Sequence, residues 1–323
     1  MTYPLHRLCG AIIMALAAAP TFAADAYPAR PVRIIVNSAP GALLDVTTRA
    51  VAQQMAENLV QPVVVENMAG AAGMLGIRYV KAQKPDGYTI LATANTLALA
   101  QATKLEPGYD LARDFTGIGM MNKAPLLMVG FSAQPDKTLS QLIAHAKASP
   151  GTMSYATAGI GTSTHMAAAL FVHQAGIKML HVPYKGNAGA MPDVLGGRVN
   201  MIFDGANSSG PYVQDGKLRA FAVSSPKRLP AFPDIPTLAE QGLPNYSFYV
   251  YMGLTAPVGT PTPVVMRLAK ALKAAQASEA VRERFRKDSA EAGNMSPEEF
   301  TEFLRQDLQR NIKVVADLGI PKE

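Results

Sequence analysis

Residues 33–55 read RIIVNSAPGALLDVTTRAVAQQM, and this stretch decides the class of fold. An apolar run, Ile34 to Val36, ends in a turn of small residues at 37–42, and an amphipathic helical pattern follows. A strand that passes directly into a helix is one half of a β-α-β unit. Small residues at the turn leave the N–H groups of the helix start uncovered, and these groups attract anions. The stretch therefore predicts an α/β domain whose first turn can hold a negatively charged group.

The same alternation continues along the chain in two series. In the first, strands are expected at 32–37, 63–66, 88–93, 117–121 and 126–131, with helices at 44–59 and 75–83. In the second, helices at 139–147, 163–174 and 189–195 alternate with strands at 153–156, 179–182, 199–203 and 218–223. A helical tail begins at 262 and ends with a helix at 297–318. The pattern predicts two doubly wound α/β lobes, 27–123 plus 226–323 and 124–225, joined by a hinge of two strands.

The N-terminus has the three-part pattern of a secretory signal peptide. A basic residue precedes the apolar stretch 8–19, and small residues follow at a cleavage point after Ala23 or Ala26. The apolar stretch is shorter than a membrane span, so we interpret 1–26 as a cleaved leader, with a buried N-terminal helix as the alternative. The single cysteine, Cys9, lies inside this segment. A mature chain without cysteine excludes disulfides, thiolate metal sites and cysteine nucleophiles.

Composition and motifs disfavour several classes of function. The net charge is +6, but no basic run with interleaved aromatics occurs, so nucleic acid binding is not expected. The five histidines do not pair at metal-ligand spacing, which argues against a metal site. No G-x-S-x-G elbow accompanies Ser163, His165 and Asp204, so an esterase triad is not expected. The segment GAAGMLG at 70–76 lacks the G-x-G spacing of a dinucleotide loop. We therefore predict no cofactor and no catalytic residues.

Four predicted strand-to-helix turns share one chemistry, because each is rich in Gly, Ala, Ser, Thr or Asn. They lie at 37–42, 93–97, 156–165 and 203–209. In an open α/β sheet, ligands bind beyond the carboxyl ends of the strands, where these turns are expected. Main-chain N–H groups, hydroxyls and amides there can bind an anion without an arginine. The candidate ligand-binding residues are Ser38, Ala39, Pro40, Gly41, Ala42, Asn95, Thr96, Thr157, Ala158, Gly159, Gly161, Thr162, Ser163 and Asp204.

Each turn also has an ordinary structural interpretation. Thr162, Ser163 and Thr164 can each cap the helix that follows, which would leave the amides of the turn free for an anion. Asp45 is expected to face the first turn of its own helix, where the helix dipole favours a carboxylate. Asp204 ends an apolar strand, where it would contact a ligand or a water molecule. Four such turns in one chain favour a binding site over four unrelated caps.

Several segments together carry a family likeness. They include YPARPVRIIVNSAPGALLD, KPDGYTIL, YATAGIGTSTHMAAALF, HVPYKGNAGAMPDVLGGRVNMIFD and LPAFPDIPTLAEQGLP, in this order from Tyr27 onward. The chain resembles the Bug-type solute receptors of the tripartite tricarboxylate transporter family. The resemblance implies a type II periplasmic binding protein fold whose lobes close on a small carboxylate and pass it to a membrane permease. It also implies that main-chain amides, hydroxyls and ordered water from both lobes hold the acid, at the candidate residues given above.

The first turn departs from the pattern of that family. It reads Pro40-Gly41-Ala42-Leu43-Leu44-Asp45, where the family usually has PGG and a small polar residue before the aspartate. The added methyl and isobutyl groups make the turn narrower and more apolar. We therefore predict a larger or more apolar ligand, an aromatic carboxylate such as terephthalate or a benzoate. The alternative is that Leu43 and Leu44 pack into the lobe.

Three functions remain open at this point. The leading prediction is a periplasmic binding protein, a monomer without catalysis that closes on its ligand and docks onto a permease. An exported enzyme acting on organic acids or esters would need a nucleophile, a base or a metal beside the groove. A sensor subunit that docks onto a signalling partner would use the same closed state as a transport receptor.

Overall fold

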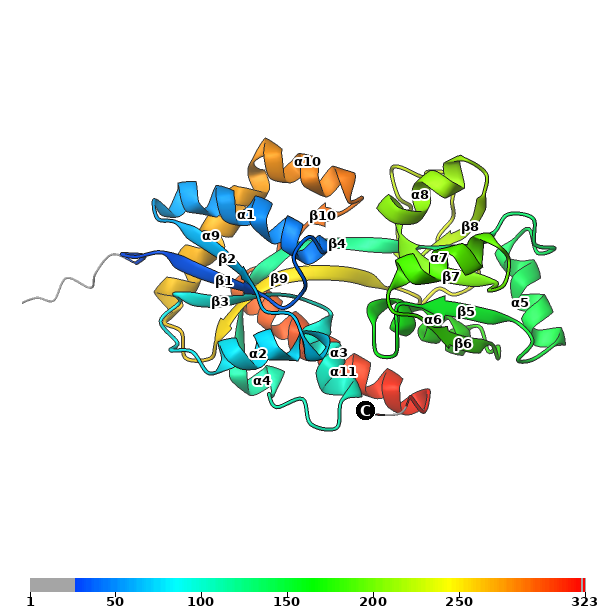
Figure 1. Ribbon diagram of the computed structural model, residues 1–323, viewed down its shortest axis with the longest axis horizontal. Coiled ribbons are helices and arrows are strands. Elements are labelled where there is room, and N and C mark those ends of the chain that lie inside the picture. Colours follow the sequence, from blue (N-terminus) through cyan, green and yellow to red (C-terminus); the bar gives the residue numbers. More distant parts are fainter. Residues whose placement is uncertain (1–26, 321, 323) are drawn as a thin grey trace, which may run out of the picture.

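The computed structural model describes residues 27–320 and 322. The predicted signal peptide and Cys9 lie outside the described residues. The chain forms two α/β lobes side by side along its longest axis (Figure 1). The first lobe contains β1 (Val32–Val36), α1 (Leu43–Leu59), β2 (Val63–Asn67), the 3-10 helix η1 (Ala71–Gly73), α2 (Met74–Lys81), β3 (Thr89–Ala94), α3 (Thr96–Thr103), α4 (Leu111–Asp114), β9 (Tyr249–Pro257), α9 (Thr262–Ala277), α10 (Glu279–Lys287), β10 (Glu291–Ala292) and α11 (Pro297–Asp317).

The second lobe lies between these segments in sequence. It contains α5 (Leu139–Ala148), β5 (Ser154–Thr157), α6 (Ser163–Gln174), β6 (Leu180–Pro183), α7 (Asn187–Leu195), β7 (Met201–Gly205), α8 (Ala206–Gln214) and β8 (Leu218–Val223). One further strand, β4 (Phe115–Phe131), belongs to both lobes. The predicted helices and strands occur in the expected order, but the prediction did not include α3, α4, α8, β9 and β10. The bounds of β8 agree with those expected from the sequence.

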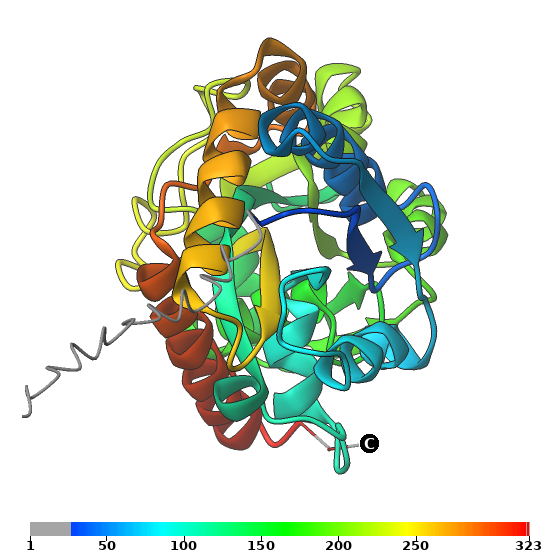
Figure 2. The same ribbon diagram turned by 90° about the vertical axis from the view of Figure 1, so that its left-hand side faces the viewer.

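The sheet of the first lobe is mixed and covered by helices on both faces (Figure 2). β1 pairs in parallel with β2 and β3, whereas β9 runs antiparallel to β3 and to β4. Successive side chains of a strand point to opposite faces. Ile34 accordingly packs in a core with residues of α1 and α9, and Ile35 in a core with residues of α2, α3 and α11. The continuous apolar run at 34–36 is thus explained by burial on two faces.

The sheet of the second lobe follows the same principle. β5 pairs in parallel with β6 and β7, and β4 pairs antiparallel with β7 and β8. Met128 of β4 is buried in a core with residues of α5 and α6, while its neighbour Leu127 is buried in a core with residues of α7. Both sheets therefore present the carboxyl ends of their parallel strands, and the turns that follow them, as potential ligand sites.

The first hinge strand differs from the prediction. The two strands expected at 117–121 and 126–131 are a single strand, β4, of 17 residues. The intervening residues continue the ladder with β9, pairing Asn122 with Met252 and Pro125 with Tyr249. The sequence NKAP at 122–125 is typical of a turn, but here Pro125 lies where the strand passes from one sheet to the other.

The segment before β9 packs on the second lobe. The sequence pattern places residues 226–248 in the first lobe, yet Leu238 and Tyr246 are buried in the core of the second. The Tyr246 ring stacks on Phe203 with ring centroids 6.2 Å apart, and its hydroxyl donates to the Ala167 carbonyl oxygen at 2.8 Å. We therefore propose that the return crossing begins at β9, so that β4 and β9 form the two hinge strands.

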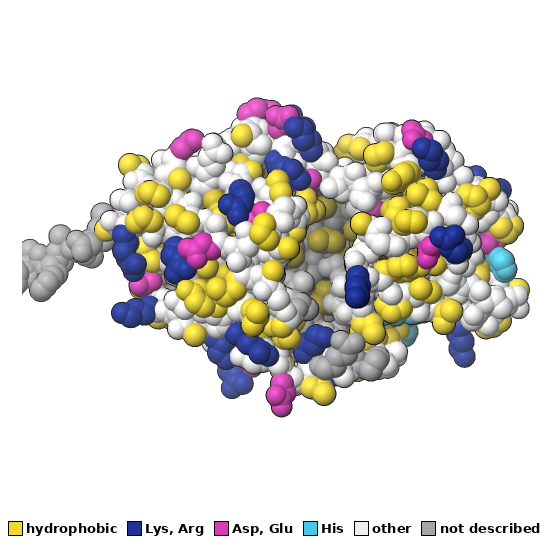
Figure 3. Space-filling view, viewed as in Figure 1, with side chains coloured by type: hydrophobic (Ala, Val, Ile, Leu, Met, Phe, Trp, Pro, Cys, Tyr) yellow, Lys and Arg dark blue, Asp and Glu magenta, His cyan; other side chains and the backbone are white. Residues whose placement is uncertain are grey.

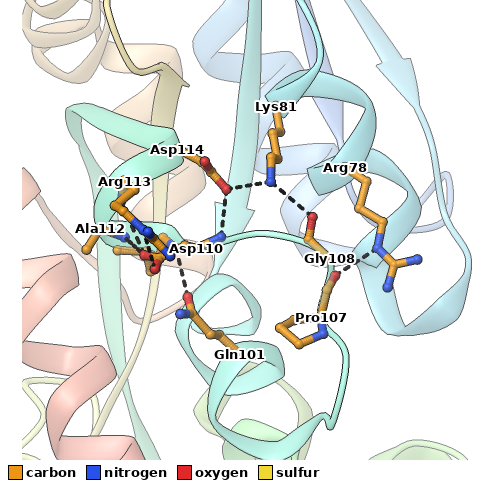
Figure 4. A network of polar contacts seen from close by, with 10 residues as sticks. Arg78, Lys81, Gln101, Pro107, Gly108, Asp110, Ala112, Arg113 and Asp114 are labelled. Atoms are coloured by element: carbon orange, nitrogen blue, oxygen red, sulfur yellow. Dashed lines mark hydrogen bonds and ion pairs between the residues drawn. The ribbon is translucent and has the colours of Figure 1, made fainter.

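A polar network fixes the segment that follows α3 (Figure 4). The Lys81 ammonium lies 2.8 Å from an Asp114 carboxylate oxygen, and the Asp110 amide donates to the same oxygen at 2.6 Å. The Tyr109 hydroxyl donates to the Leu97 carbonyl oxygen at 2.6 Å, which ties the segment back to α3 itself. This anchoring matters because α3 packs against the second lobe, where its residue Leu99 is part of the core.

Candidate functional site

A groove separates the two lobes on the face shown in Figure 3. The turns after β1 and β3 approach it from the first lobe, and those after β5 and β7 approach it from the second (Figure 1). A separate cavity of about 580 Å³ lies in the first lobe, between α2 and the segment 104–114. None of the predicted site residues lines that cavity, so the groove is the candidate site.

The first turn already contains an anion that belongs to the chain itself. The Asp45 carboxylate is 3% exposed and accepts the Gly41 amide at 2.8 Å. It also accepts the Asn67 side-chain amide at 2.9 Å and the Arg49 guanidinium at 3.0 Å. Burial would raise the pKa of the Asp45 carboxyl, but these three hydrogen bonds lower it below its usual value. The predicted structural role of Asp45 is confirmed, and it includes shaping the turn in front of its helix.

The first turn also offers one group that is not engaged. The Gly41 amide is held by Asp45, and the Ala42 amide donates to the Ala39 carbonyl oxygen at 3.2 Å. The Ser38 hydroxyl oxygen, by contrast, is buried and has no hydrogen-bond partner among the described residues. Pro40 has no N–H group to donate. Ser38 is therefore the residue of this turn best suited to bind a ligand, together with the first free amides of α1.

The two candidate residues of the turn after β3, Asn95 and Thr96, make different kinds of contact. The Asn95 side chain donates to the Tyr249 carbonyl oxygen at 3.1 Å and accepts the Tyr251 amide at 3.0 Å. It thereby holds hinge strand β9, and both of its polar atoms are engaged. The Thr96 hydroxyl lies 3.3 Å from the side-chain amide of Asn37, which directly follows β1. Asn37 lies in the predicted turn at 37–42 but is not among the candidate binding residues. These contacts make Asn95 a hinge contact and place Thr96 beside Asn37.

The turn after β5 uses more of its own amides than the sequence predicts. Thr162 caps α6 as expected, and its hydroxyl oxygen accepts the His165 amide at 3.3 Å. The Ala158 amide donates to the Thr164 hydroxyl at 2.9 Å, and the Gly161 amide donates to His165 Nδ1 at 3.1 Å. The expectation that capping leaves these amides free is therefore wrong, because side chains of the first helical turn reach back into the loop.

Other groups of this turn face different neighbours. The Gly159 amide donates to the Thr157 hydroxyl oxygen at 3.3 Å. A Cβ atom built on Gly161 would lie 2.9 Å from the Thr103 hydroxyl at the end of α3, so the turn lies directly against the first lobe. Ser163 is partly buried at the first position of α6. Its hydroxyl and the first amides of α6 are the donors that this turn can present to an anion.

A stack of three aromatic rings, which no sequence pattern predicts, supports the same turn. The His165 and His181 rings are parallel with centroids 4.2 Å apart, and Tyr155 stacks on His181 at 5.0 Å. His181 Nε2 lies 2.7 Å from the Thr157 hydroxyl. Burial and the neighbouring His181 lower the pKa of His165 to about 4, and burial lowers the pKa of His181. Both rings are therefore neutral at pH 7 and hold the two ends of the turn.

This stack predicts an acid-sensitive second lobe. An unfolded histidine has a pKa of about 6.5. Above pH 6.5, His165 is neutral in both the folded and the unfolded protein. Between pH 6.5 and about 4, His165 binds a proton in the unfolded chain but not in the folded protein. The free energy of unfolding should thus fall by about 1.4 kcal/mol per pH unit across this window, roughly 3 kcal/mol in all. Urea unfolding measured from pH 7.5 to 4 checks this expectation.

Two variants give that measurement its control. His165→Gln should flatten the pH dependence in this window, whereas His173→Gln, which changes an exposed histidine of the same helix, should leave it as in the parent protein. If the parent and His165→Gln lose stability with the same slope, the stacked pair does not control the acid response.

The turn after β7 contains a buried carboxylate with an unusual environment. Asp204 is 3% exposed, and its Oδ1 accepts the Asn187 side-chain amide at 2.6 Å. Asp204 Oδ2 and Asn187 Oδ1 are both buried without a hydrogen-bond partner among the described residues. The Asn187 side chain also donates to the Phe203 carbonyl oxygen at 3.2 Å, which fixes its orientation.

Asn187 is the functional candidate that sequence reasoning missed. It lies at the first position of α7, in the segment PYKGNAG. The loop before it is tied to the turn after β5, because the Gly186 amide donates to the Ala158 carbonyl oxygen at 3.1 Å. The strand before this loop and its content of Gly and Asn were signals of the kind used for the other four turns.

The described residues hold no group of three or more His, Cys, Asp or Glu side chains arranged to bind a metal ion. In the same part of the chain, no helix has both the length and the apolar character needed to span a bilayer.

The histidine nearest to Ser163 in sequence, His165, uses Nδ1 to accept the Gly161 amide and stacks on His181. Among residues 27–320, no carboxylate is hydrogen-bonded to the His165 ring, whereas the base of a catalytic triad is oriented by one.

Solved structures with this fold show what kind of protein the chain resembles. The periplasmic binding protein BugD is 33% identical, with a TM-score of 0.76, over 92% of this chain and 100% of its own. Rpa4515 of R. palustris, solved with adipate, is 30% identical, with a TM-score of 0.78, over 91% and 99%. MatC of Rhodopseudomonas palustris, solved with malate, is 29% identical, with a TM-score of 0.76, over 90% and 100%.

A family profile covers most of the chain and agrees with these structures. The tripartite tricarboxylate transporter family receptor, TctC, matches residues 47–320. The match includes the turns after β3, β5 and β7, and it spans both lobes. The resemblance noted in the sequence is thereby confirmed, and the chain belongs to the tripartite tricarboxylate transporter receptor family.

Proposed function

We propose that this receptor captures a small organic carboxylate in the groove between its lobes and delivers it to a tripartite tricarboxylate transporter permease. One observation carries the proposal: Ser38 in the first lobe and Asp204 in the second each have a buried polar atom without a partner among the described residues. Buried polar groups are nearly always hydrogen-bonded in folded proteins. A ligand, or water ordered around it, would supply the missing partners from both sides.

The binding mode follows from the donors near the groove. The Ser38 hydroxyl, the Ser163 hydroxyl and the first amides of α1 and α6 are uncharged. A hydrogen bond to a charged group contributes about 1.5–3 kcal/mol, and a helix N-terminus adds about 0.3–1 kcal/mol. Several such contacts suffice for micromolar affinity, which corresponds to about 8 kcal/mol. The adipate and malate in the related structures agree with a small carboxylate as the ligand.

The leucines of the first turn support a ligand with an apolar body. Leu44 is 6% exposed and packs into the core of the first lobe, as the alternative interpretation held, but Leu43 is 37% exposed on the first turn of α1. A planar aromatic ring would bury part of this side chain. We therefore propose an aromatic dicarboxylate such as terephthalate as the first ligand to test beside aliphatic acids.

The cellular setting belongs to the same proposal. A receptor of this family works in the periplasm. The predicted signal peptide would direct export of the chain to that compartment and would be cleaved after Ala23 or Ala26. We propose that the receptor acts as a monomer and without catalysis. Closure of its two lobes on the ligand is sufficient for delivery to the permease. Incubation of candidate acids with the purified protein should leave them chemically unchanged; turnover would instead favour the exported-enzyme alternative.

Ligand screening tests the proposed function. Saturation by the right carboxylate should raise the melting temperature by mass action, with about 2.7 kcal/mol of added stability at 100 times Kd. We expect stabilisation by terephthalate or benzoates to exceed that by citrate-like acids. Stabilisation by citrate-like acids alone would contradict the aromatic class, and no response to any carboxylate would contradict the function.

A single hydroxyl provides a sharper test of the site. Ser38→Ala should weaken carboxylate binding by about 1–2 kcal/mol, or roughly 5- to 30-fold, because one hydrogen bond to the acid is lost. Isothermal titration measures the change. Ser140→Ala, which removes an exposed hydroxyl on α5, should bind like the parent protein. Equal affinity of the parent and Ser38→Ala would remove Ser38 from the site.

A further inference from the structure

The carboxyl end of β7 presents two hydrogen-bond acceptors that the protein does not satisfy. Asp204 Oδ2 and Asn187 Oδ1 belong to side chains joined by a hydrogen bond of 2.6 Å, so the two oxygens lie in one small region. The Asp204 side chain belongs to a residue that is only 3% exposed. The Asn187 amide is already committed to Asp204 Oδ1 and to the Phe203 carbonyl oxygen. Neither side chain has a hydrogen left to offer an anion in this arrangement.

A bare carboxylate is a poor match for this region. An ionised carboxylate of a ligand only accepts hydrogen bonds, and a second negative charge beside a buried carboxylate is unfavourable. A buried charge is costly unless it is paired or fully hydrogen-bonded. The described partner of Asp204 is the neutral amide of Asn187. The missing partner is thus a hydrogen-bond donor, and a positively charged donor compensates the charge as well.

The first lobe has the opposite character. Its unpartnered buried atom is the Ser38 hydroxyl, which can donate, and the amides at the start of α1 lie in the same turn. The turns at the groove therefore differ in polarity: those after β1 and β5 offer donors, at Ser38 and at the start of α6, whereas the turn after β7 offers acceptors. Within the proposed ligand class, an acid with one carboxylate and one donor group fits this arrangement better than a symmetric diacid such as terephthalate, so a benzoate that bears a donor becomes the favoured aromatic ligand.

We propose that Asp204 and Asn187 select a carboxylate that also bears a hydrogen-bond donor, an ammonium or a hydroxyl group. This inference rests on the proposed function and narrows its ligand class. The acid end of the ligand faces the donors of the turns after β1 and β5, and the ammonium or hydroxyl donates to Asp204 Oδ2 and Asn187 Oδ1. Asp204 acts here as a specificity-determining residue.

Matched acids test the inference without any change to the protein. Titration calorimetry at pH 7.5 compares succinate with malate and aspartate, adipate with 2-aminoadipate, and benzoate with 4-hydroxybenzoate. In the series that binds, the donor-bearing acid should bind at least tenfold more tightly than its donor-free partner. A donor-free acid that binds as tightly as its partner would overturn the inference and leave the proposed function standing. Absence of binding by every acid would overturn both.

A variant links the preference to Asp204. Asp204→Asn keeps the shape of the side chain but removes the charge and supplies a donor. The preference for the donor-bearing acid should fall at least tenfold, and affinity for the donor-free acid should be equal or higher. Asp215→Asn, an exposed position of the same lobe, makes the same change of charge and should keep the parent preference. The assignment of Asp204 is wrong if the Asp204→Asn variant also keeps the parent preference while circular dichroism shows that it is folded.

Discussion

Replacement of Gly161 by leucine should abolish carboxylate binding, with an affinity at least 100-fold below that of the parent protein. Gly161 has φ +72°, a backbone conformation that costs other residues about 1–2 kcal/mol. A Cβ atom there would lie 2.9 Å from the Thr103 hydroxyl of α3. The side chain therefore pushes the turn after β5 away from the first lobe, which displaces the donors at the start of α6 from the groove. Isothermal titration with the acid found by screening measures the loss.

A second glycine separates this effect from backbone strain. Gly151 has φ +78° and lies in the same lobe, but a Cβ atom there meets nothing within 4 Å. Gly151→Leu should cost similar backbone energy and leave binding intact. The site would be misplaced if Gly161→Leu, with the second lobe folded, bound the acid within threefold of the parent protein.

Replacement of Asp45 by alanine should destabilise the first lobe and weaken binding together. The change leaves the Gly41 amide without its acceptor and leaves the Asn67 side-chain amide with the Ser38 carbonyl oxygen only. Loss of these bonds to a buried charge should lower the free energy of unfolding by about 2–4 kcal/mol, with little added by Arg49, which is half exposed. Binding should weaken because Asp45 shapes the turn that presents Ser38. Urea unfolding and calorimetry measure the two effects.

The lowered pKa of Asp45 fixes the sign of its pH dependence. The stabilisation is present above the ordinary aspartate pKa of about 3.9 and disappears as the pH falls through the lower value of the folded state. Asp317→Ala is the control, since it removes an exposed acid that pairs with Lys313 at the same i, i+4 spacing. It should change stability by less than about 0.5 kcal/mol. Equal, small effects of both variants would show that the Asp45 network does not hold the turn.

The sequence was sufficient for the architecture because burial leaves a direct trace in it. A strand covered on both faces must be apolar at consecutive positions, as at 34–36, and a helix packed on one face must be apolar at helical spacing. The break between the predicted strands at 117–121 and 126–131 is different. The segment 122–125, which ends in Pro125, has the composition of a turn. Only its pairing with β9, more than a hundred residues away, shows that the strand continues.

The site could be predicted at the level of turns but not of atoms. Whether the Gly161 amide is free depends on the rotamer of His165, and whether that histidine is neutral depends on His181 stacked against it. Asn187 is a candidate because the fold places it, at the end of the β6–α7 loop, within hydrogen-bond distance of Asp204. These facts arise from distances between segments, which periodicity and composition do not encode.

A crystal structure with the bound acid tests the central claim most directly. The account predicts that the carboxylate lies in the groove, with oxygens about 2.7–3.2 Å from the Ser38 hydroxyl of the first lobe and from donors at the start of α6 in the second. A carboxylate held mainly by lysine or arginine side chains, or bound outside the groove, would contradict it.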